Sequence, residues 1–302
     1  MPVSRVDQFV RQLDDAGISF ERDAMLSRLT TIGLGGPAEV LARPRSRSEV
    51  ATVVSVAATL DLPVRVLGAG SNLLVSDAGV AGVVLHTGGL DDVRIEENGA
   101  VDAGAGCHFP SLVKKTVASG LRGLEGGVGI PGTLGGVLTM NAGAYLFSVG
   151  PLVEEVVAVS AEHGLVTMPR ESIDFRYRRS SFGHDLIVAS ARLSLRPDVP
   201  ATLRAEMDAH MQTRKLTQPV GVKSAGCIFK NPEGSSAGRL IDELGLKGMR
   251  VGGARVSEVH ANFIVHDGSA NASEVLALID SLRERVFGET HVELETEVMT
   301  WN

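Results

Sequence analysis

The stretch GGVGIPGTLGGVLTMNAGAY, residues Gly126–Tyr145, carries seven glycines and no charged residue. Glycine loses more conformational freedom on folding than any other residue, so a segment this rich in glycine needs a structural reason. One reason is close approach of the backbone to a ligand, with N–H groups directed at phosphate. The alternative is a tightly packed network of turns that binds nothing.

A second glycine loop, Gly68-Ala69-Gly70-Ser71-Asn72, lies between the strand-like runs Val64–Leu67 and Leu73–Val75. It is not the GxGxxG loop of a Rossmann fold, because Leu73 stands at the third glycine position. The chain also contains no GxxxxGK[ST] motif, which excludes a P-loop nucleotide site. Taken alone the loop could be a simple β-turn. Together, the two loops indicate a large cofactor that carries phosphate.

The composition favours a globular protein of two or three domains, since the chain has 302 residues and 44% hydrophobic content. A net charge of −7 disfavours binding to nucleic acid. Two cysteines at unrelated positions predict reduced thiols in a cytoplasmic protein, with no metal site. We find no secretory signal and no apolar run long enough to span a membrane, so no membrane partner is expected.

Helix and strand signals alternate along the chain. Asn271 and Glu274 form a capping-box pattern that predicts a helix ending before Gly288. The final segment, His291–Trp301, alternates apolar and acidic residues as an exposed strand does. The sequence GSSAG at Gly234–Gly238 fits the GxSxG motif of hydrolases. The residues before it are not a buried strand, so we favour a helix cap at Ser235 or Ser236.

Four blocks, in order, resemble the MurB family of UDP-N-acetylenolpyruvoylglucosamine reductases. These blocks are GLGGPAEV (33–40), LGAGSNLLV (67–75), GIPGTLGGVLTMNAGAY (129–145) and SAGCIFKNP (224–232). Three shorter blocks add to the resemblance: YRRS (177–180), VGGARVSEVHANFIV (251–265) and LETEV (294–298). The short gap after Asn231 is similar to the subclass that lacks an insertion in the substrate domain.

The resemblance implies an α+β flavoprotein of three domains. Two FAD-binding domains of the vanillyl-alcohol-oxidase (PCMH) type would span residues 1–77 plus 290–302 and residues 78–201. A C-terminal α+β substrate-binding domain would span residues 202–289. The C-terminal strand would pack on the N-terminal domain and make that domain discontinuous.

The implied reaction is the reduction of an enolpyruvyl ether on a UDP-sugar to a lactyl ether, in peptidoglycan precursor synthesis. FAD would be bound non-covalently, and NADPH would donate the hydride. The resemblance also implies a cytoplasmic monomer. One alternative is another FAD-dependent oxidoreductase of the same fold that acts on an alcohol or a sugar. A nucleotide-sensing module without catalysis is a third possibility.

The resemblance places catalysis at Arg178, Cys227 and Glu297. Arg178 matches an arginine that stabilises the substrate carboxylate, a role that suits a planar guanidinium; alternatively it belongs to a solvated basic loop. Cys227 stands at the proton-donor position, where many members carry serine, and a thiol is a competent acid near neutral pH. Alternatively, Cys227 is only a small apolar residue of the core. In that case Ser224 is the alternative proton donor. Glu297 would serve as a neutral donor or a relay, although its strand pattern alone suggests an exposed side chain.

Binding residues follow from the same blocks. The cofactor-binding residues are expected to be Gly68, Ala69, Gly70, Ser71, Asn72, Pro131, Gly132, Thr133, Gly135, Gly136, Asn141, Gly143, Ala144, Tyr145 and Val188. Backbone N–H groups of the glycine loops would meet the pyrophosphate, and Val188 would lie on the adenine side. The substrate-binding residues are expected to be Tyr177, Lys215, Asn231 and Arg239, which without the family would be read as solvent-exposed.

Overall fold

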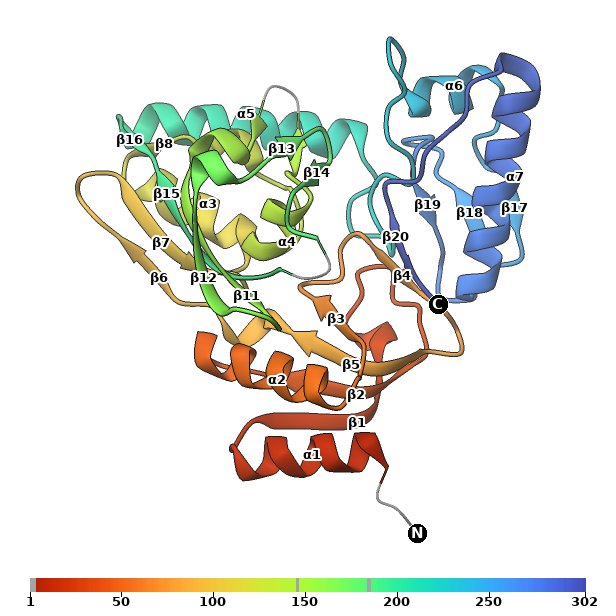
Figure 1. Cartoon of the computed structure of the whole chain (residues 1–302). Coiled ribbons are helices and arrows are strands. Elements are labelled where there is room, and N and C mark those ends of the chain that lie inside the picture. Colours follow the sequence, from red (N-terminus) through yellow and green to blue (C-terminus); the bar gives the residue numbers. More distant parts are fainter. Residues whose placement is uncertain (1–3, 145–146, 184–185) are drawn as a thin grey trace. The chain divides into compact units, whose positions relative to one another are not determined.

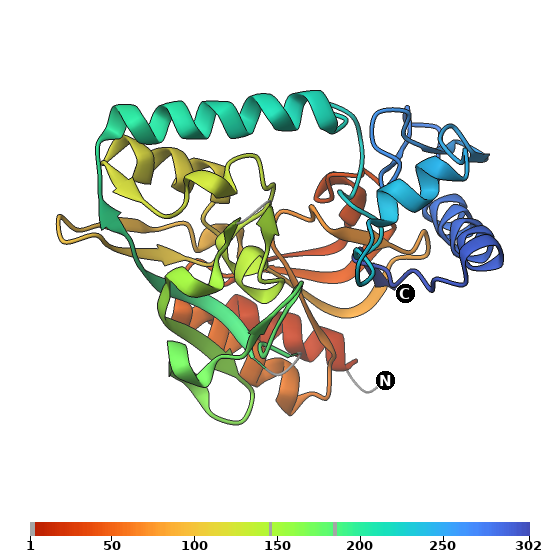
Figure 2. The same cartoon turned by 90° about the horizontal axis from the view of Figure 1, so that it is seen from above.

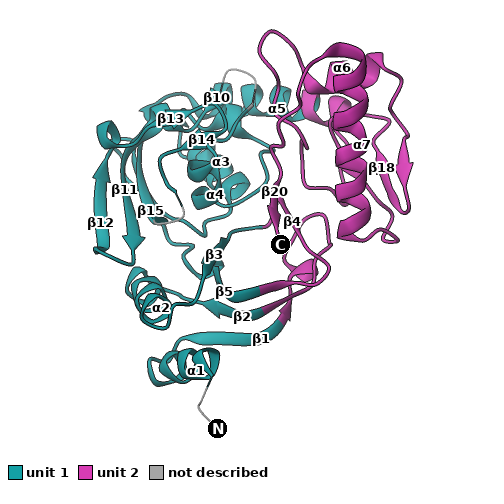
Figure 3. Ribbon diagram, turned by 45° about the vertical axis from the view of Figure 1, so that its right-hand side comes forward, with its two compact units in different colours: residues 1–23, 39–69, 81–212 teal, residues 24–38, 70–80, 213–302 magenta. Residues whose placement is uncertain are grey.

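The computed structural model describes residues 4–144, 147–183 and 186–302 (Figures 1 and 2). The chain divides into two compact units, drawn in different colours in Figure 3. Unit 1 contains residues 1–23, 39–69 and 81–212, and unit 2 contains residues 24–38, 70–80 and 213–302. Each unit is therefore assembled from three separate segments of the chain.

The structure has these α-helices: α1 (Arg5–Asp15), α2 (Arg47–Thr59), α3 (Phe109–Ala118), α4 (Leu134–Thr139), α5 (Pro200–Thr217), α6 (Ala237–Glu243) and α7 (Ala272–Thr290). The strands of the first half are β1 (Ser19–Met25), β2 (Pro37–Arg43), β3 (Val64–Leu67), β4 (Leu73–Val75), β5 (Val80–His86), β6 (Val93–Ile95), β7 (Ala100–Gly104), β8 (Leu121–Arg122), β9 (Gly143–Ala144) and β10 (Phe147–Ser148). The strands of the second half are β11 (Val153–Ser160), β12 (Gly164–Pro169), β13 (Phe175–Arg176), β14 (Arg179–Ser180), β15 (Ile187–Ser194), β16 (Arg196–Pro197), β17 (Arg250–Val251), β18 (Ala254–Val256), β19 (Ile264–Val265) and β20 (Met299–Trp301).

Unit 1 is built on two sheets. One has five strands in the order β12-β11-β15-β7-β6, with every neighbouring pair antiparallel. The other has the order β1-β2-β5-β3, in which β3 and β5 run parallel. Helix α2 packs on β11 and β12, and its N-terminus is capped by Ser46, whose side chain accepts a hydrogen bond from the Glu49 N–H. One apolar core joins the helices to both sheets, from Phe9 in α1 to Leu193 in β15.

Unit 2 combines a three-stranded antiparallel sheet, β17-β18-β19, with α6, α7 and the parallel pair β20-β4. Its core takes Val275, Leu278, Ile279 and Leu282 from α7. The predicted capping box is confirmed: the Asn271 side chain accepts from the Glu274 N–H, and the Glu274 carboxylate accepts from the Asn271 N–H.

Two local predictions were wrong. Helix α7 does not end before Gly288 but continues to Thr290, where His291 adopts the left-handed conformation at φ 56°. The expected strand at His291–Trp301 is reduced to β20, because residues 291–298 make a single isolated bridge, at Thr296. Strand β20 pairs with β4, so the C-terminal segment does return to the N-terminal third of the chain. The three-domain division remains a prediction.

No helix within the described ranges is both long enough and apolar enough to cross a membrane.

Candidate active site

The two glycine loops meet at Gly68 and Thr133. A Cβ atom added to Gly68 would lie 2.5 Å from the Thr133 Oγ1, so only glycine fits at this point. The backbone around Thr133 is anchored by an antiparallel bridge to His108 and by a hydrogen bond from the Phe109 N–H to the Gly132 carbonyl, 3.0 Å long. The two loops are therefore in contact at this point, and a shared binding site remains a prediction.

Thr133 is the N-cap of α4, but its hydroxyl does not cap the helix. The residue is 6% exposed, and its Oγ1 has no hydrogen-bond partner among the described residues. A buried hydroxyl without a partner costs free energy, and native structures rarely retain one without a reason. Beside it, the Cβ position of Gly136 has the Thr133 Oγ1 as its nearest neighbour, at 3.8 Å, so the backbone is open there. This part of the loop is suited to receive a polar group of a ligand.

Other glycines of the run have packing roles. Gly126 and Gly127 lie against the rings of Phe147 and Phe109, and a Cβ on Gly135 would lie 2.9 Å from that of Ala105. The Gly135 N–H donates to the Ala105 carbonyl at 2.8 Å. It is therefore not available to a phosphate, contrary to the expectation from the sequence. The glycine run is partly a packed network and partly an open loop.

Arg178 lies in the two-residue turn between β13 and β14. Its φ is 54°, a left-handed conformation that is uncommon for a residue other than glycine. Its Nη1 donates to the Gly143 carbonyl at 2.7 Å, and its guanidinium stacks on the Tyr177 ring, 5.3 Å from the centroid. The neighbouring Arg176 is exposed and pairs with Asp174. The solvated-loop interpretation thus fits Arg176, whereas Arg178 is half-buried and directed at the glycine run.

Asn141 supports this turn from the glycine run. Its Nδ2 donates to the Arg176 carbonyl at 2.9 Å, and its Oδ1 accepts from the Gly150 N–H at 3.2 Å.

The remaining predicted cofactor-binding residues include Val188, Ala144 and Tyr145. Val188 lies in β15, is 5% exposed, and packs its side chain in the core of unit 1. Ala144 belongs to β9. Tyr145 lies outside the described residues.

Cys227 and Glu297 lie on paired segments of unit 2. On one side of residues 227–230 lies the segment around Phe263, and Phe263 itself forms an antiparallel bridge with Cys227. On the other side, the Glu297 N–H donates to the Ile228 carbonyl at 2.7 Å, and the Lys230 N–H donates to the Glu295 carbonyl at 2.8 Å. Both residues are half-buried, so the exposed-strand interpretation of Glu297 was wrong. Gly226, with φ 76°, makes the turn that leads into Cys227.

The first glycine loop reaches the same place. Asn72 donates through Nδ2 to the Glu297 carbonyl at 2.9 Å, and its own carbonyl accepts from the Met299 N–H at 3.0 Å. The Ser71 carbonyl is the nearest atom, 3.8 Å away, to a Cβ built on Gly226. Within unit 2 the structure therefore brings together Gly70–Asn72, Cys227 and Glu297. Within unit 1 it brings together Gly68 with Thr133, and Arg178 with Gly143.

The predicted substrate-binding residues of unit 2 have mixed surroundings. Asn231 Oδ1 accepts from the Ala237 N–H at 3.1 Å, and Ser236 caps α6 as predicted, accepting from the Arg239 N–H. The Arg239 guanidinium forms an exposed pair with Glu243 one turn later, 3.5 Å away. Lys215 is exposed in the last turn of α5. The hydrolase interpretation of Ser236 is not supported, since its hydroxyl has an ordinary capping role.

Two family models match this chain. One is described as an FAD binding domain and matches residues 38–167; the other is described as the C-terminal domain of UDP-N-acetylenolpyruvoylglucosamine reductase and matches residues 218–301. The UDP-N-acetylenolpyruvoylglucosamine reductase of Moorella thermoacetica is 44% identical over 276 residues, which cover 91% of each chain. The chain belongs to the MurB family. The reductase of Prochlorococcus marinus is 38% identical, over 93% of this chain and 97% of the relative.

Solved structures give the same family. MurB from Thermus caldophilus superposes with a TM-score of 0.80 at 39% identity, covering 94% of this chain and 99% of that one. An alkyldihydroxyacetonephosphate synthase matches 63% of this chain at 17% identity and a TM-score of 0.50, which shows a shared fold only. The prediction of a PCMH-type FAD-binding part followed by a MurB C-terminal domain is confirmed.

One residue of this MurB-family site was missed by the sequence reasoning. Asn262 is 3% exposed, and both ends of its amide bond the backbone of Phe229. A signal was present, because Asn262 is the one polar residue in the otherwise apolar run Ala261–Val265. A buried amide in such a run is expected to be hydrogen-bonded.

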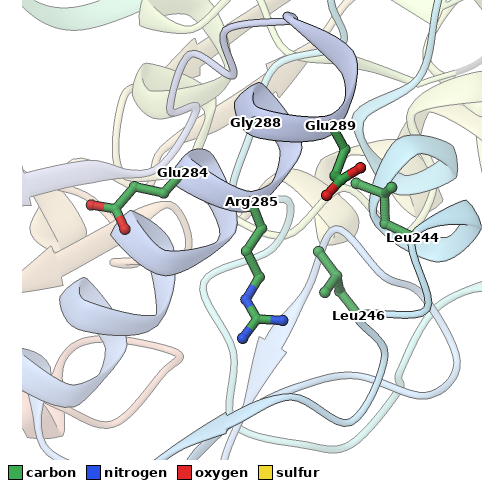
Figure 4. Close-up of a pocket in the computed structure, with 6 residues that line it drawn as sticks. All are labelled: Leu244, Leu246, Glu284, Arg285, Gly288 and Glu289. Atoms are coloured by element: carbon green, nitrogen blue, oxygen red, sulfur yellow. The ribbon is translucent and has the colours of Figure 1, made fainter.

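A cavity of about 430 Å³ lies elsewhere in unit 2, beside the C-terminal half of α7 (Figure 4). Its lining contains none of the predicted site residues; it consists of Leu244, Leu246, Glu284, Arg285, Gly288 and Glu289. Glu284 projects away from the two leucines, whereas Glu289 faces Leu244. We assign this cavity no role in the site.

Proposed function

We propose that this chain is an FAD-dependent, NADPH-consuming reductase of UDP-N-acetylenolpyruvoylglucosamine that serves peptidoglycan precursor synthesis. Family membership over nearly the whole chain supports this activity. The observation that carries it within the structure is the pairing of the Cys227 and Glu297 segments, tied through Asn72 to the first glycine loop. The alternative of an oxidoreductase acting on an alcohol or a sugar finds no support in the curated relatives reported above.

The residues present fit FAD. The buried Thr133 Oγ1 offers a hydroxyl that lacks a partner among the described residues, and Gly68 leaves the space beside it clear of side chain. The open backbone at Gly136 adds room on the same side. We assign the pyrophosphate to this place, where hydroxyl and backbone donors suit an anion. FAD, when bound, supplies the hydride that it has taken from NADPH.

Reduction of the enolpyruvyl double bond consumes one hydride, at the terminal CH₂, and one proton, at the carbon next to the carboxylate. Negative charge develops on the carboxylate between these additions, so fixed cations and hydrogen-bond donors there lower the barrier. Arg178 meets that need in our proposal. A planar guanidinium suits a carboxylate, and the bond to the Gly143 carbonyl together with stacking on Tyr177 orients that of Arg178.

We assign the proton to the Cys227 thiol. A thiol is far more acidic than an alcohol, so it can donate a proton near neutral pH and be protonated again from solvent. Glu297 assists as a hydrogen-bond donor or proton relay on the paired segment. The UDP-sugar is proposed to bind at Tyr177, Lys215, Asn231 and Arg239. Of these, Lys215 and Arg239 supply positive charge in a chain whose net charge is −7.

Anaerobic stopped-flow absorbance of the flavin tests this proposal. We expect NADPH to bleach the bound flavin, and UDP-N-acetylenolpyruvoylglucosamine to restore its colour. Cys227→Ser should keep both steps, because an alcohol can replace the thiol with lower acidity. Cys227→Ala should be reduced by NADPH normally but reoxidised by substrate at least 100-fold more slowly. Full turnover by Cys227→Ala would reject the thiol as donor, and no reoxidation of the wild type by the UDP-sugar would reject the function.

A cytoplasmic location and a monomeric state belong to the same proposal. They rest on the family resemblance.

A further inference from the structure

The side-chain amide of Asn262 bonds both backbone polar groups of Phe229, its N–H and its carbonyl. The Oδ1 of Asn262 accepts from the Phe229 N–H at 2.9 Å, and its Nδ2 donates to the Phe229 carbonyl at 2.8 Å. The Asn262 carbonyl also accepts from the Ile228 N–H at 2.9 Å. One residue thus makes three hydrogen bonds to two consecutive residues that are each 1% exposed.

These bonds fix a segment whose other edge carries Glu297. The Ile228 carbonyl accepts from the N–H groups of Glu297 and Val298, and Phe229 forms a bridge with Thr296. Residues 228–229 are therefore held between Asn262 on one side and residues 296–298 on the other. Since side chains alternate along an extended segment, a slip by one residue would turn Cys227 to the opposite face.

The chemistry of the asparagine side chain matches this task. An amide offers one acceptor and one donor at the spacing of a backbone peptide, so it can pair with Phe229 as a neighbouring strand would. Aspartate would set a carboxylate oxygen against the Phe229 carbonyl, and leucine would leave both backbone groups of Phe229 buried without this partner. The Asn262 N–H itself donates to His260 Nδ1 at 3.2 Å, which fixes the residue from its own side.

We propose that Asn262 is a positioning residue for proton delivery: it fixes the register of residues 227–229 and so sets the Cys227 thiol relative to the Glu297 carboxylate. This inference rests on the proposed function for its kinetic consequence. Its geometric content, the placement of the thiol, is independent of the substrate. Asn262 touches neither FAD nor the reacting atoms in this proposal and acts only through the segment that it holds.

Half-reaction kinetics of Asn262→Ala separate this role from a loss of stability. We expect the rate of flavin reduction by NADPH to change less than twofold and the rate of reoxidation by the UDP-sugar to fall 10-fold or more. Asn271→Ala is the control, because it removes the hydrogen-bonded N-cap of α7 in the same unit without touching residues 227–229. Equal slowing of both half-reactions, or a profile identical to that of Asn271→Ala, would overturn the proposal.

The second measurement is the rate of Cys227 alkylation by iodoacetamide in the FAD-bound protein, followed by mass spectrometry in a Cys107→Ser background. We expect a change of at least fivefold in Asn262→Ala and less than twofold in Asn271→Ala. An unchanged rate in Asn262→Ala would overturn the positioning role even if reoxidation slows. A changed rate in a protein that the UDP-sugar does not reoxidise would uphold the positioning role while rejecting the proposed function.

Discussion

Replacing Thr133 with valine tests the buried hydroxyl at the meeting point of the glycine loops. Valine keeps the branched shape of threonine, and the backbone at this position (φ −105°, ψ 159°) is extended, a conformation that valine favours. No capping bond is lost, because the Thr133 hydroxyl does not cap α4. The substitution therefore removes one polar atom and changes little else.

Two effects of opposite sign follow from this geometry. In the protein without FAD, the hydroxyl lacks a hydrogen-bond partner among the described residues, and such a group costs about 1–3 kcal/mol. Thr133→Val should therefore stabilise the apoprotein by about 1 kcal/mol. With FAD bound, a hydroxyl that donates to a phosphate oxygen is worth about 1.5–3 kcal/mol. Its loss should weaken FAD binding by about 10-fold to 150-fold.

The assays are urea denaturation of the apoprotein and titration of FAD by flavin fluorescence. Thr116→Val is the control, since Thr116 is also buried in unit 1 but its Oγ1 already donates to the Val113 carbonyl at 3.0 Å. This control should not stabilise the apoprotein and should leave FAD affinity unchanged. An FAD affinity of Thr133→Val within twofold of the wild type, or a loss of apoprotein stability such as a hydrogen-bonded threonine would show, would contradict this assignment of the Thr133 hydroxyl.

Two further predictions concern unit 2. Asp77 accepts hydrogen bonds from the Ala272 N–H, the Ser273 N–H and the Ser273 hydroxyl at the start of α7. Partial burial opposes ionisation of Asp77, but these three bonds outweigh it and lower its pKa. The lowered pKa means that Asp77 contributes stability above the unfolded value, about 3.9, and that this contribution is lost as the pH falls through the folded value. Asp77→Asn should flatten the pH dependence of the urea midpoint between about pH 5 and 2; a slope equal to that of the wild type would contradict this. Leu278→Ala removes a fully buried side chain from the core of unit 2. It should lower the free energy of unfolding, measured by urea denaturation, by about 2–5 kcal/mol. A loss below about 1 kcal/mol would contradict this and show that neighbouring side chains fill the cavity.

Features set by residues close together in sequence could be predicted. The caps at Ser236 and Asn271 depend on three or four consecutive residues, and both formed as expected. The end of α7 could not be placed at Gly288, because glycine lowers helix propensity by only about 1 kcal/mol, and the helix continues to a left-handed cap at His291, whose N–H donates to the Phe287 carbonyl. The alternation at His291–Trp301 did not produce a full strand, because its polar groups bond irregular segments around Ile228 and Asn72.

The candidate site was predictable only in part, for a related reason. The contact of Gly68 with Thr133 agrees with the idea that both loops serve one ligand, but the packing roles of Gly127 and Gly135 depend on Phe109 and Ala105, which no local pattern identifies. Asn262 acts on Phe229 from 33 residues away. Contacts of this kind depend on the fold, and the sequence could suggest only that a polar residue in an apolar run needs a partner.

The bond from Asn72 to Glu297 spans 225 residues, and β4 pairs with β20 over a similar separation. During synthesis at roughly 5–20 residues per second, the buried strand Leu73–Val75 would wait roughly 10–45 seconds for its partner. Contacts so distant in sequence also slow folding itself, because a long loop must close before they form. Until then the nascent chain leaves the apolar strand Leu73–Val75 without its partner strand, and we expect this segment to be prone to aggregation when synthesis is interrupted.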